Sequence, residues 1–162
     1  MRNATLCLLV KKEKSSIKEI LLAMKKRSFG MGKWNGVGGK FDEGKGDKNI
    51  LDAAIRETEE EIGVKVEDFK KVAELSFRFP YKNEWNQDVH VFLAQKWIGN
   101  PEESEEMAPK WFKATEIPYK EMWDDDKYWL PHVLAGKKIE ADFIFKEGEI
   151  IDKHNVKFVE EL

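Results

Sequence analysis

Apolar and polar residues alternate along several short stretches of the chain, as they do in half-buried β-strands. The first two stretches, residues 5–10 and 19–24, are separated by a polar turn over residues 11–16. This arrangement predicts two strands joined by a short connection. A comparable pattern predicts further strands in five later segments: residues 72–79, 87–97, 110–112, 139–145 and 150–159.

Helical spacing appears in the middle of the chain. One apolar stripe is formed by residues three or four positions apart, namely Leu51, Ile55, Thr58 and Ile62. Asp47 or Asn49 can cap the start of this helix, and Gly63 supplies its end. Residues 127–135 predict a second helix, interrupted by Pro131. Mixed strands with two helices favour an α/β sandwich in which helices cover a sheet.

Length and composition are typical of one globular domain. A chain of 162 residues can bury one substantial core, so we expect a single domain over residues 1–162. Hydrophobic residues make up 41% and charged residues 36%, which excludes disordered and fibrous classes. No apolar run reaches the length of a membrane span, and residues 1–10 are too short and too polar at their flanks for a signal peptide.

Net charge and cysteine content limit the classes of binding partner and the cellular setting that we expect. The net charge of −3 argues against bulk binding to nucleic acid or to an anionic membrane, which usually needs a basic surface. A small anionic ligand stays compatible with it if a divalent metal lies between carboxylates and phosphates. The single cysteine, Cys7, lies in an apolar run and predicts a buried thiol. We therefore expect a monomer in a reducing, cytoplasmic setting.

Three carboxylates share one side of the central helix. Glu57, Glu60 and Glu61 fall within an arc of ~100°, away from the apolar stripe, whereas Glu59 projects elsewhere. Like charges this close repel, and a bound Mg²⁺ or Mn²⁺ would relieve the repulsion. Taken alone, an acidic helix face is more often a solvated surface. Its context favours a metal site, because a loop with five glycines between residues 28 and 39 precedes the helix.

The segment from Arg56 to Val64 reads RETEEEIGV and resembles the second half of the Nudix box, REUxEExGU, where U is aliphatic. Residues 38–44, GGKFDEG, resemble its opening. Thr58 departs mildly from the pattern, whereas Lys48 stands where the family has an acidic residue. The loop over residues 44–48 is also about three residues longer than usual. Arg56 thus lacks its ordinary partner, and Asp47 or Glu43 could replace it.

The resemblance implies a mixed sheet between helices, an α/β/α sandwich, and Mg²⁺-dependent hydrolysis of a nucleotide, with Mn²⁺ as an alternative ion. Within the family, the chain is most similar to members that hydrolyse oxidised purine nucleoside triphosphates such as 8-oxo-dGTP and 2-hydroxy-dATP. The similarity includes residues 24–27, 34–36, 88–92, 122–123 and 125–126. It implies a small-molecule nucleotide as the partner, converted by water to the monophosphate and pyrophosphate.

The resemblance also assigns roles to residues of this chain. Metal ligands are implied at Glu57, Glu60, Glu61 and Glu106. Catalytic roles are implied for Arg56 and for Glu60, Glu61 and Glu106, any of which could accept the proton of the attacking water. Substrate binding is implied for Thr5, Lys25, Phe29, Asn35, Gly38, Gly39, Trp123, Asp125 and Asp126.

Several of these residues have simpler interpretations. Lys25 can be a solubilising lysine at a strand end, Trp123 a core aromatic, and Asp124–Asp126 a helix cap. Phe77 and Phe79 could line the same pocket or only the core, and His90 and His132 are expected to be structural.

Two rival functions stay open. The protein could be a Nudix enzyme for ADP-ribose, a dinucleotide or dCTP, or a Nudix domain that binds a nucleotide without turnover. Lys48 and the longer loop are the only support for the second rival. Because surface loops tolerate changes of length, deletion of residues 45–47 is expected to leave a folded protein.

Overall fold

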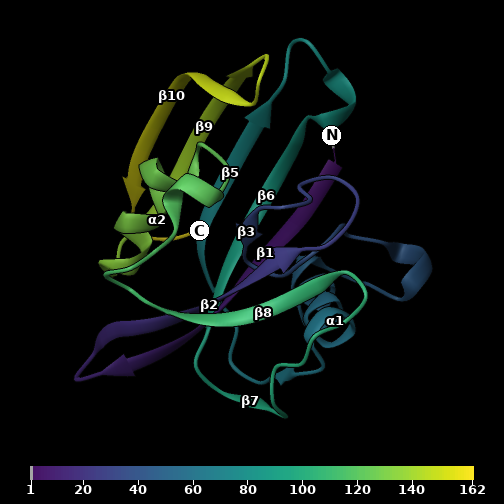
Figure 1. The fold of residues 1–162 in the computed structure, drawn as a ribbon, viewed down its shortest axis with the longest axis vertical. Helices are drawn as coiled ribbons and strands as arrows, with labels where there is room; N and C mark the ends of the chain where they lie inside the picture. The colour runs from purple at the N-terminus through teal and green to yellow at the C-terminus, as the bar shows by residue number, and fades with distance from the viewer. Residues whose placement is uncertain (1) are drawn as a thin grey trace.

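The computed structural model describes residues 2–162 and is built on a mixed eight-stranded sheet (Figure 1). The order of its strands is β10-β9-β5-β6-β1-β2-β3, with β8 also paired to β2. β1 runs parallel to β6 and β5 parallel to β9, and the other pairs are antiparallel. The strands are β1 (Arg2–Glu13), β2 (Ser16–Lys25), β3 (Trp34–Asn35), β5 (Lys70–Arg78), β6 (Gln87–Ala94), β8 (Met107–Lys113), β9 (Lys138–Lys146) and β10 (Ile150–Val159).

Each strand predicted from the alternation is present, with two differences. The turn between β1 and β2 contains only Lys14 and Ser15, both with positive φ, so the strands run further into the polar residues. The strand predicted over residues 87–97 ends at Ala94, and its last part forms a separate strand, β7 (Trp97–Ile98). β7 pairs with β4 (Lys65–Val66) in a small second sheet.

The first helix, α1 (Ile50–Ile62), begins and ends as the sequence indicates. Asn49 is its N-cap and accepts a hydrogen bond from the Asp52 amide at 2.9 Å, and Gly63 ends it with φ of 73°. Thr58 and Ile62 of the apolar stripe are buried. Leu51, the first residue of the predicted stripe, is 39% exposed, so the stripe is not buried along its whole length. It lies in the first turn, ahead of the buried residues of the helix, which begin at Ala53.

The second helix, α2 (Asp126–Leu134), continues through Pro131 and is not interrupted by it. Pro131 is exposed, and the only backbone bond that it removes is its own to the carbonyl four residues earlier. Buried Trp129, Leu130 and Val133 hold the helix on the sheet.

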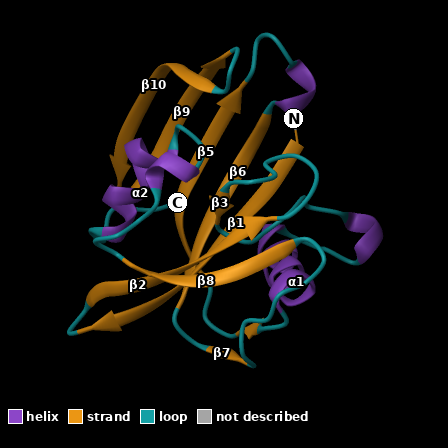
Figure 2. Cartoon of the chain, viewed as in Figure 1, coloured by secondary structure: helices purple, strands orange, loops and turns teal. Residues whose placement is uncertain are grey.

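The two helices cover opposite faces of the sheet, and β1 separates their cores. Leu8 and Val10 belong to the cluster that contains α2, whereas Cys7 and Leu9 belong to the cluster that contains Ala54 and Ile62 of α1. Alternation along one strand thus serves two layers, which confirms the α/β/α sandwich (Figure 2).

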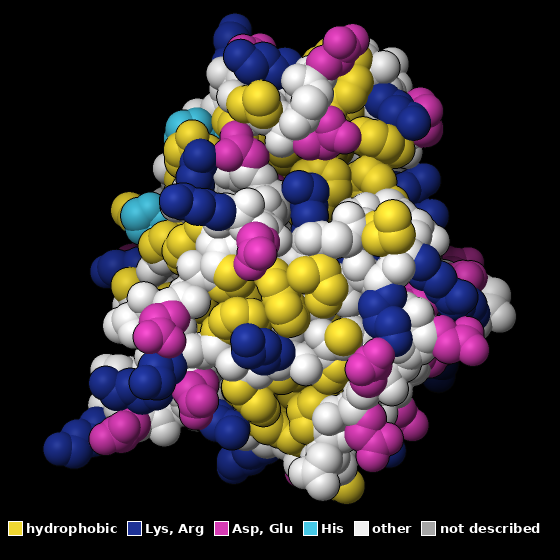
Figure 3. All heavy atoms as spheres, viewed as in Figure 1, with side chains coloured by type: hydrophobic (Ala, Val, Ile, Leu, Met, Phe, Trp, Pro, Cys, Tyr) yellow, Lys and Arg dark blue, Asp and Glu magenta, His cyan; other side chains and the backbone are white. Residues whose placement is uncertain are grey.

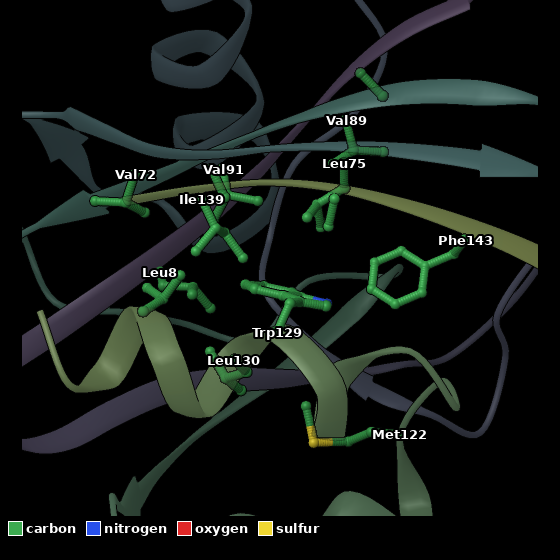
Figure 4. Close-up of a cluster of buried hydrophobic side chains, with 14 of the residues drawn as sticks. Leu8, Val72, Leu75, Val89, Val91, Met122, Trp129, Leu130, Ile139 and Phe143 are labelled. Carbon is green, nitrogen blue, oxygen red and sulfur yellow. The ribbon is translucent and has the colours of Figure 1, made fainter. Parts of the chain in front are cut away.

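Figure 4 shows the first of these cores, with Trp129 of α2 between Leu8 and Phe143. In the second core, Cys7 is buried as predicted, and burial raises the pKa of its thiol to about 12. Across residues 2–162, the model contains no helix with the length and apolar character needed to cross a lipid bilayer.

Candidate active site

Two adjoining cavities lie beside the end of β2, with volumes of about 640 and 670 Å³. The first, here called the aromatic cavity, is lined by Phe29, Phe77, Phe79, Trp85, Trp123, Trp129 and Phe145, among others. The second, the acidic cavity, contains carboxylates from α1 and from the segment before β8. The two cavities share a wall made of Lys25, Gly38, Gly39, Lys40 and Glu106.

The acidic cavity contains the carboxylates predicted as metal ligands. Glu57, Glu60 and Glu61 line it from α1, as their common arc on the helix predicts. Glu106, from the chain just before β8, faces them from the shared wall. The fold thus brings together four carboxylates from segments far apart in the sequence.

Arg56 has found a carboxylate partner in spite of the altered loop. Its Nε and a terminal nitrogen donate to the two carboxylate oxygens of Asp47 at 2.9 and 2.7 Å. Of the two alternatives left by the sequence, the structure has Asp47. The hydrogen bonds from Arg56 lower the pKa of Asp47 in spite of the burial of this carboxyl. Arg56 also contacts Glu57 at 2.8 Å and Glu60 at 3.3 Å, so it orders two of the predicted ligands.

This pairing changes the expectation for the loop. Asp47 is only 5% exposed, and its Oδ2 also accepts a hydrogen bond from the Asp42 amide at 3.0 Å. Deletion of residues 45–47 would therefore remove the buried partner of Arg56. The sequence-based expectation of tolerance treated the whole loop as solvated surface, and one of its residues is not.

Glu61 is the most deeply buried carboxylate of this cavity, with 6% exposure. The Gly38 amide donates to its Oε2 at 3.2 Å. Burial raises the pKa of Glu61 to about 7, and the negative charges of Glu57 and Glu106 act in the same direction.

The glycine loop sets the position of the carboxylates. A Cβ atom at Gly39 would lie 2.4 Å from the carboxyl carbon of Glu57, so a side chain there would displace Glu57. At Gly38, φ is 156° and a Cβ would lie 2.1 Å from the Thr5 carbonyl oxygen. Both glycines are therefore required for the close approach of the loop to β1 and α1.

Hard divalent cations fit this donor set, because it consists of carboxylate oxygens on a concave surface. Within residues 2–162, no three candidate ligands are close enough together to hold an ion as they stand. Glu57 and Glu60 turn toward Arg56, and Glu106 turns toward Arg27 at 3.2 Å. The side chains of Glu60 and Glu106 are 49% and 44% exposed, which leaves them free to rotate inward onto a cation.

The aromatic cavity ends on a pair of buried carboxyls. Asp125 and Asp126 are 4% and 3% exposed. Trp129 donates from Nε1 to Oδ2 of Asp125 at 2.8 Å, and within the described residues Oδ2 of Asp126 has no hydrogen-bond partner. Burial raises the pKa of Asp125 to about 7 and that of Asp126 well above its usual range, with the charge of Asp125 adding to the second shift. Burial and the repulsion between the two carboxyls therefore both favour the protonated form.

The helix-cap interpretation of these aspartates does not match the structure. Asp125 occupies the N-cap position of α2 but makes no capping hydrogen bond with its side chain. Asp124 points elsewhere and accepts from the Ile151 amide at 2.8 Å. The carboxyls of Asp125 and Asp126 thus line the cavity, and that of Asp125 does not cap the helix.

The remaining predicted substrate-binding residues line the same cavity: Thr5, Lys25, Phe29, Asn35, Gly38, Gly39 and Trp123. Phe29 is 44% exposed at the mouth, with its ring 5.0 Å from that of Trp123. Phe77 and Phe79 line the cavity and also contact the core, so both interpretations hold. On the face drawn in Figure 3, apolar side chains gather between α2 and β8 with charged groups around them.

Sequence reasoning missed part of the aromatic wall. The ring of Trp85 lies 4.8 Å from that of Phe29 and 5.5 Å from that of Phe79. It belongs to a 3-10 helix of three residues, Asn83–Trp85, which is too short for a periodicity to mark an inward side chain. Phe145 is two residues after Phe143 on β9, and the period of two could have placed both on the inner face.

Comparisons with known proteins agree with this geometry. A family model described as "NUDIX domain" matches residues 1–133. The chain is 44% identical over 141 residues to an "Oxidized purine nucleoside triphosphate hydrolase" of Mus musculus, covering 87% of this chain and 88% of the relative. It is 43% identical over 143 residues to the protein of the same name from Danio rerio, covering 88% and 89%.

Solved structures share the fold. A "mMutator MutT protein from Bacillus halodurans" superposes with a TM-score of 0.81 at 23% identity, over 97% of this chain and 98% of that one. A "MutT NUDIX hydrolase from Burkholderia pseudomallei" gives a TM-score of 0.62 at 27% identity, over 72% and 86%. The family model and the two relatives together show that this chain belongs to the Nudix family.

Proposed function

We propose that the protein hydrolyses oxidised purine nucleoside triphosphates to the monophosphate and pyrophosphate, and so cleans the nucleotide pool. One observation carries the proposal: a buried pair of protonatable carboxyls in the aromatic cavity adjoins an acidic cavity built on the Nudix helix. The first offers a purine flat walls and a polar end, and the second offers ligands for a metal–polyphosphate complex. Both relatives are named as hydrolases of oxidized purine nucleoside triphosphates, which supports this assignment.

Each side chain of the acidic cavity has a distinct task in this scheme. Magnesium or manganese, held by Glu57, Glu60, Glu61 and Glu106, would supply the positive charge that neutralises the phosphates and acidifies water. Arg56 pairs with Glu57 and Glu60 at 2.8 and 3.3 Å, next to the position that the metal would take. Glu60, Glu61 and Glu106 are the candidates for accepting the proton of the attacking water.

Recognition of the base is assigned to the other cavity. Trp123 and Phe29 provide faces for stacking, and Asn35 offers both a donor and an acceptor to a purine edge. A protonated carboxyl donates while its ionised neighbour accepts, so Asp125 and Asp126 can match more than one edge pattern by moving their proton. This favours a broad enzyme for 8-oxo-dGTP and 2-hydroxy-dATP over a guanine specialist.

The non-catalytic alternative loses its main ground. This alternative rested on the longer loop and on Lys48, which stands where the family has an acidic residue. Asp47 supplies the missing carboxylate to Arg56. A Nudix enzyme for ADP-ribose, a dinucleotide or dCTP is the remaining rival. Buried carboxyls at the end of an aromatic cavity favour a purine edge with several N–H groups.

The proposal is tested with a panel of nucleotides and Mg²⁺, scored for release of pyrophosphate. We expect the highest kcat/KM for 8-oxo-dGTP and 2-hydroxy-dATP, and little activity without a divalent ion. ADP-ribose or dCTP at the head of the panel would replace the proposed substrate. Binding of nucleotides without any turnover would restore the non-catalytic alternative.

A further inference from the structure

The longer loop of the Nudix box is an ordered turn. Asp42 accepts a hydrogen bond on its Oδ1 from the Gly44 amide at 2.9 Å, and its carbonyl accepts from the Lys45 amide at 3.1 Å. Gly46 follows with φ of 94°. Asp47 then ties the turn to Arg56 of α1 at 2.7 Å. The side chain between these anchors, that of Lys45, therefore starts from a fixed backbone position.

Lys45 lines the acidic cavity. It is not among the described residues of the aromatic cavity or of the shared wall, so it lies on the side of the acidic cavity away from the aromatic one. A nucleotide with its base in the aromatic cavity must carry its phosphates past the shared wall. The phosphate farthest from the base is the one that reaches Lys45.

Most cationic side chains around the acidic cavity are already paired with a carboxylate, whereas Lys45 can still bind an anion. Lys25 and Arg27 are engaged by Glu106, at 3.9 and 3.2 Å. Arg56 is occupied by Asp47 and by Glu57 at 2.8 Å. Lys40 and Lys45 are both exposed and form no ion pair within residues 2–162. Lys40 belongs to the shared wall, so within the described lining Lys45 is the unpaired cation of the acidic cavity beyond that wall. An ammonium group in this position can bind a phosphate without first breaking a protein contact.

We propose that the inserted turn supplies a phosphate-binding residue, Lys45, which contacts the terminal phosphate of the triphosphate and, after cleavage, the pyrophosphate product. The inference rests on the proposed function, because the orientation of the substrate comes from it. It gives the extra residues a role that the general Nudix pattern does not contain.

The test compares Lys45→Met with the matched control Lys48→Met, which removes an exposed lysine of the same loop outside the described linings of both cavities. Three quantities are measured with Mg²⁺ present: KM for 8-oxo-dGTP, inhibition by 8-oxo-dGMP, and the Kd of inorganic pyrophosphate by calorimetry. Lys45→Met should raise KM and the pyrophosphate Kd about fivefold, the size of one contact between unit charges at ~4 Å in water. Inhibition by the monophosphate should not change.

Lys45→Arg should restore both values, and Lys48→Met should leave all three at the wild-type level. Unchanged pyrophosphate affinity in Lys45→Met overturns the inference. An equal effect of Lys48→Met also overturns it, since the loop would then act only through its general charge. If the wild-type protein hydrolyses no nucleotide, the proposed function fails, and the calorimetry still decides whether Lys45 binds pyrophosphate.

Discussion

The carboxylates of the two cavities differ in their surroundings. Beside the acidic cavity, Arg56 lies against Asp47, Glu57 and Glu60, and its hydrogen bonds lower the pKa of Asp47. In the aromatic cavity, Asp125 and Asp126 are enclosed by aromatic rings, and their pKa values rise because burial penalises the charged form. The first region thus places most of its carboxylates near a guanidinium, whereas burial raises the pKa of both aspartates in the second; Glu61, buried in the acidic cavity with a pKa raised to about 7, behaves like the aspartates. Position relative to a cation, rather than residue type, separates the two roles.

Removal of ligand charge from the acidic cavity should have the largest effect. Glu60→Gln and Glu61→Gln keep the shape of the side chain but remove a charge from the predicted metal site. We expect kcat to fall on the order of 10²-fold or more, with little loss of folding stability. Steady-state kinetics and thermal melts measure both. Glu59→Gln is the control because Glu59 is exposed outside the described lining of the cavity; normal turnover in both test variants would dismiss the metal site.

Loss of the anchor of Arg56 should come next. Asp47→Ala leaves a partly buried guanidinium without its partner, and breaking such a pair costs about 3 kcal/mol. We expect a lower free energy of unfolding in denaturant, together with reduced activity. Lys48→Ala, one residue later on the surface, should change stability by less than about 0.5 kcal/mol. Equal stability of the two variants would mean that Asp47 does not anchor the helix.

Substitutions in the aromatic cavity should change the selectivity among nucleotide substrates. Asp125→Asn, Asp126→Asn and Asn35→Ala each leave part of a purine edge unpaired, which costs about 1–3 kcal/mol. We expect the ratios of kcat/KM among 8-oxo-dGTP, 2-hydroxy-dATP and dGTP to change about tenfold, with the Mg²⁺ requirement unaltered. Wild-type ratios in all three variants would show that these residues do not read the base.

The smallest expected effect is on the pH dependence of stability, and here the aspartate pair of the aromatic cavity and the ion-paired Asp47 have opposite signs. Asp125 and Asp126 have raised pKa values, so the folded state binds more protons than the unfolded state between pH ~4 and ~7. The contribution of Asp125 is present below pH ~4 and is lost as pH rises through about 7. Asp47 has a lowered pKa, so its contribution is present above pH ~4 and is lost in acid.

Thermal melts from pH 4 to 8 can separate these contributions. Asp125→Asn should flatten the decline above pH 4 and melt about 2–4 °C higher than the wild type at pH 8, as expected for about 1 kcal/mol. Asp47→Asn should instead weaken the loss of stability below pH 4. Identical pH profiles for the wild type and Asp125→Asn would mean that folding does not change the pKa of this carboxyl.

The same contrast explains what the sequence could predict. The acidic face of α1 is a local pattern, because a helix fixes the spacing of Glu57, Glu60 and Glu61. The aromatic cavity joins residues from β1, the glycine loop, β6 and the segment before α2, and only the family resemblance linked Asn35 to Asp125 and Asp126. No periodicity and no motif in the sequence marked Trp85 as a residue of the cavity. Asp47 was one of two alternatives, because the path of a lengthened loop depends on tertiary contacts.

Alternate side chains of strand β1 support the two layers of the enzyme separately. Leu8 and Val10 support the layer of α2, and Cys7 and Leu9 support the layer of α1. A change of volume at Leu8 or at Leu9 would therefore disturb one active-site wall through its own core and spare the other. An insertion of one residue between them would turn the side chains on one side of the insertion to the opposite face, and so would disturb both layers at once. Evolution can lengthen the loop before α1 more freely than it can alter the residue count of this strand.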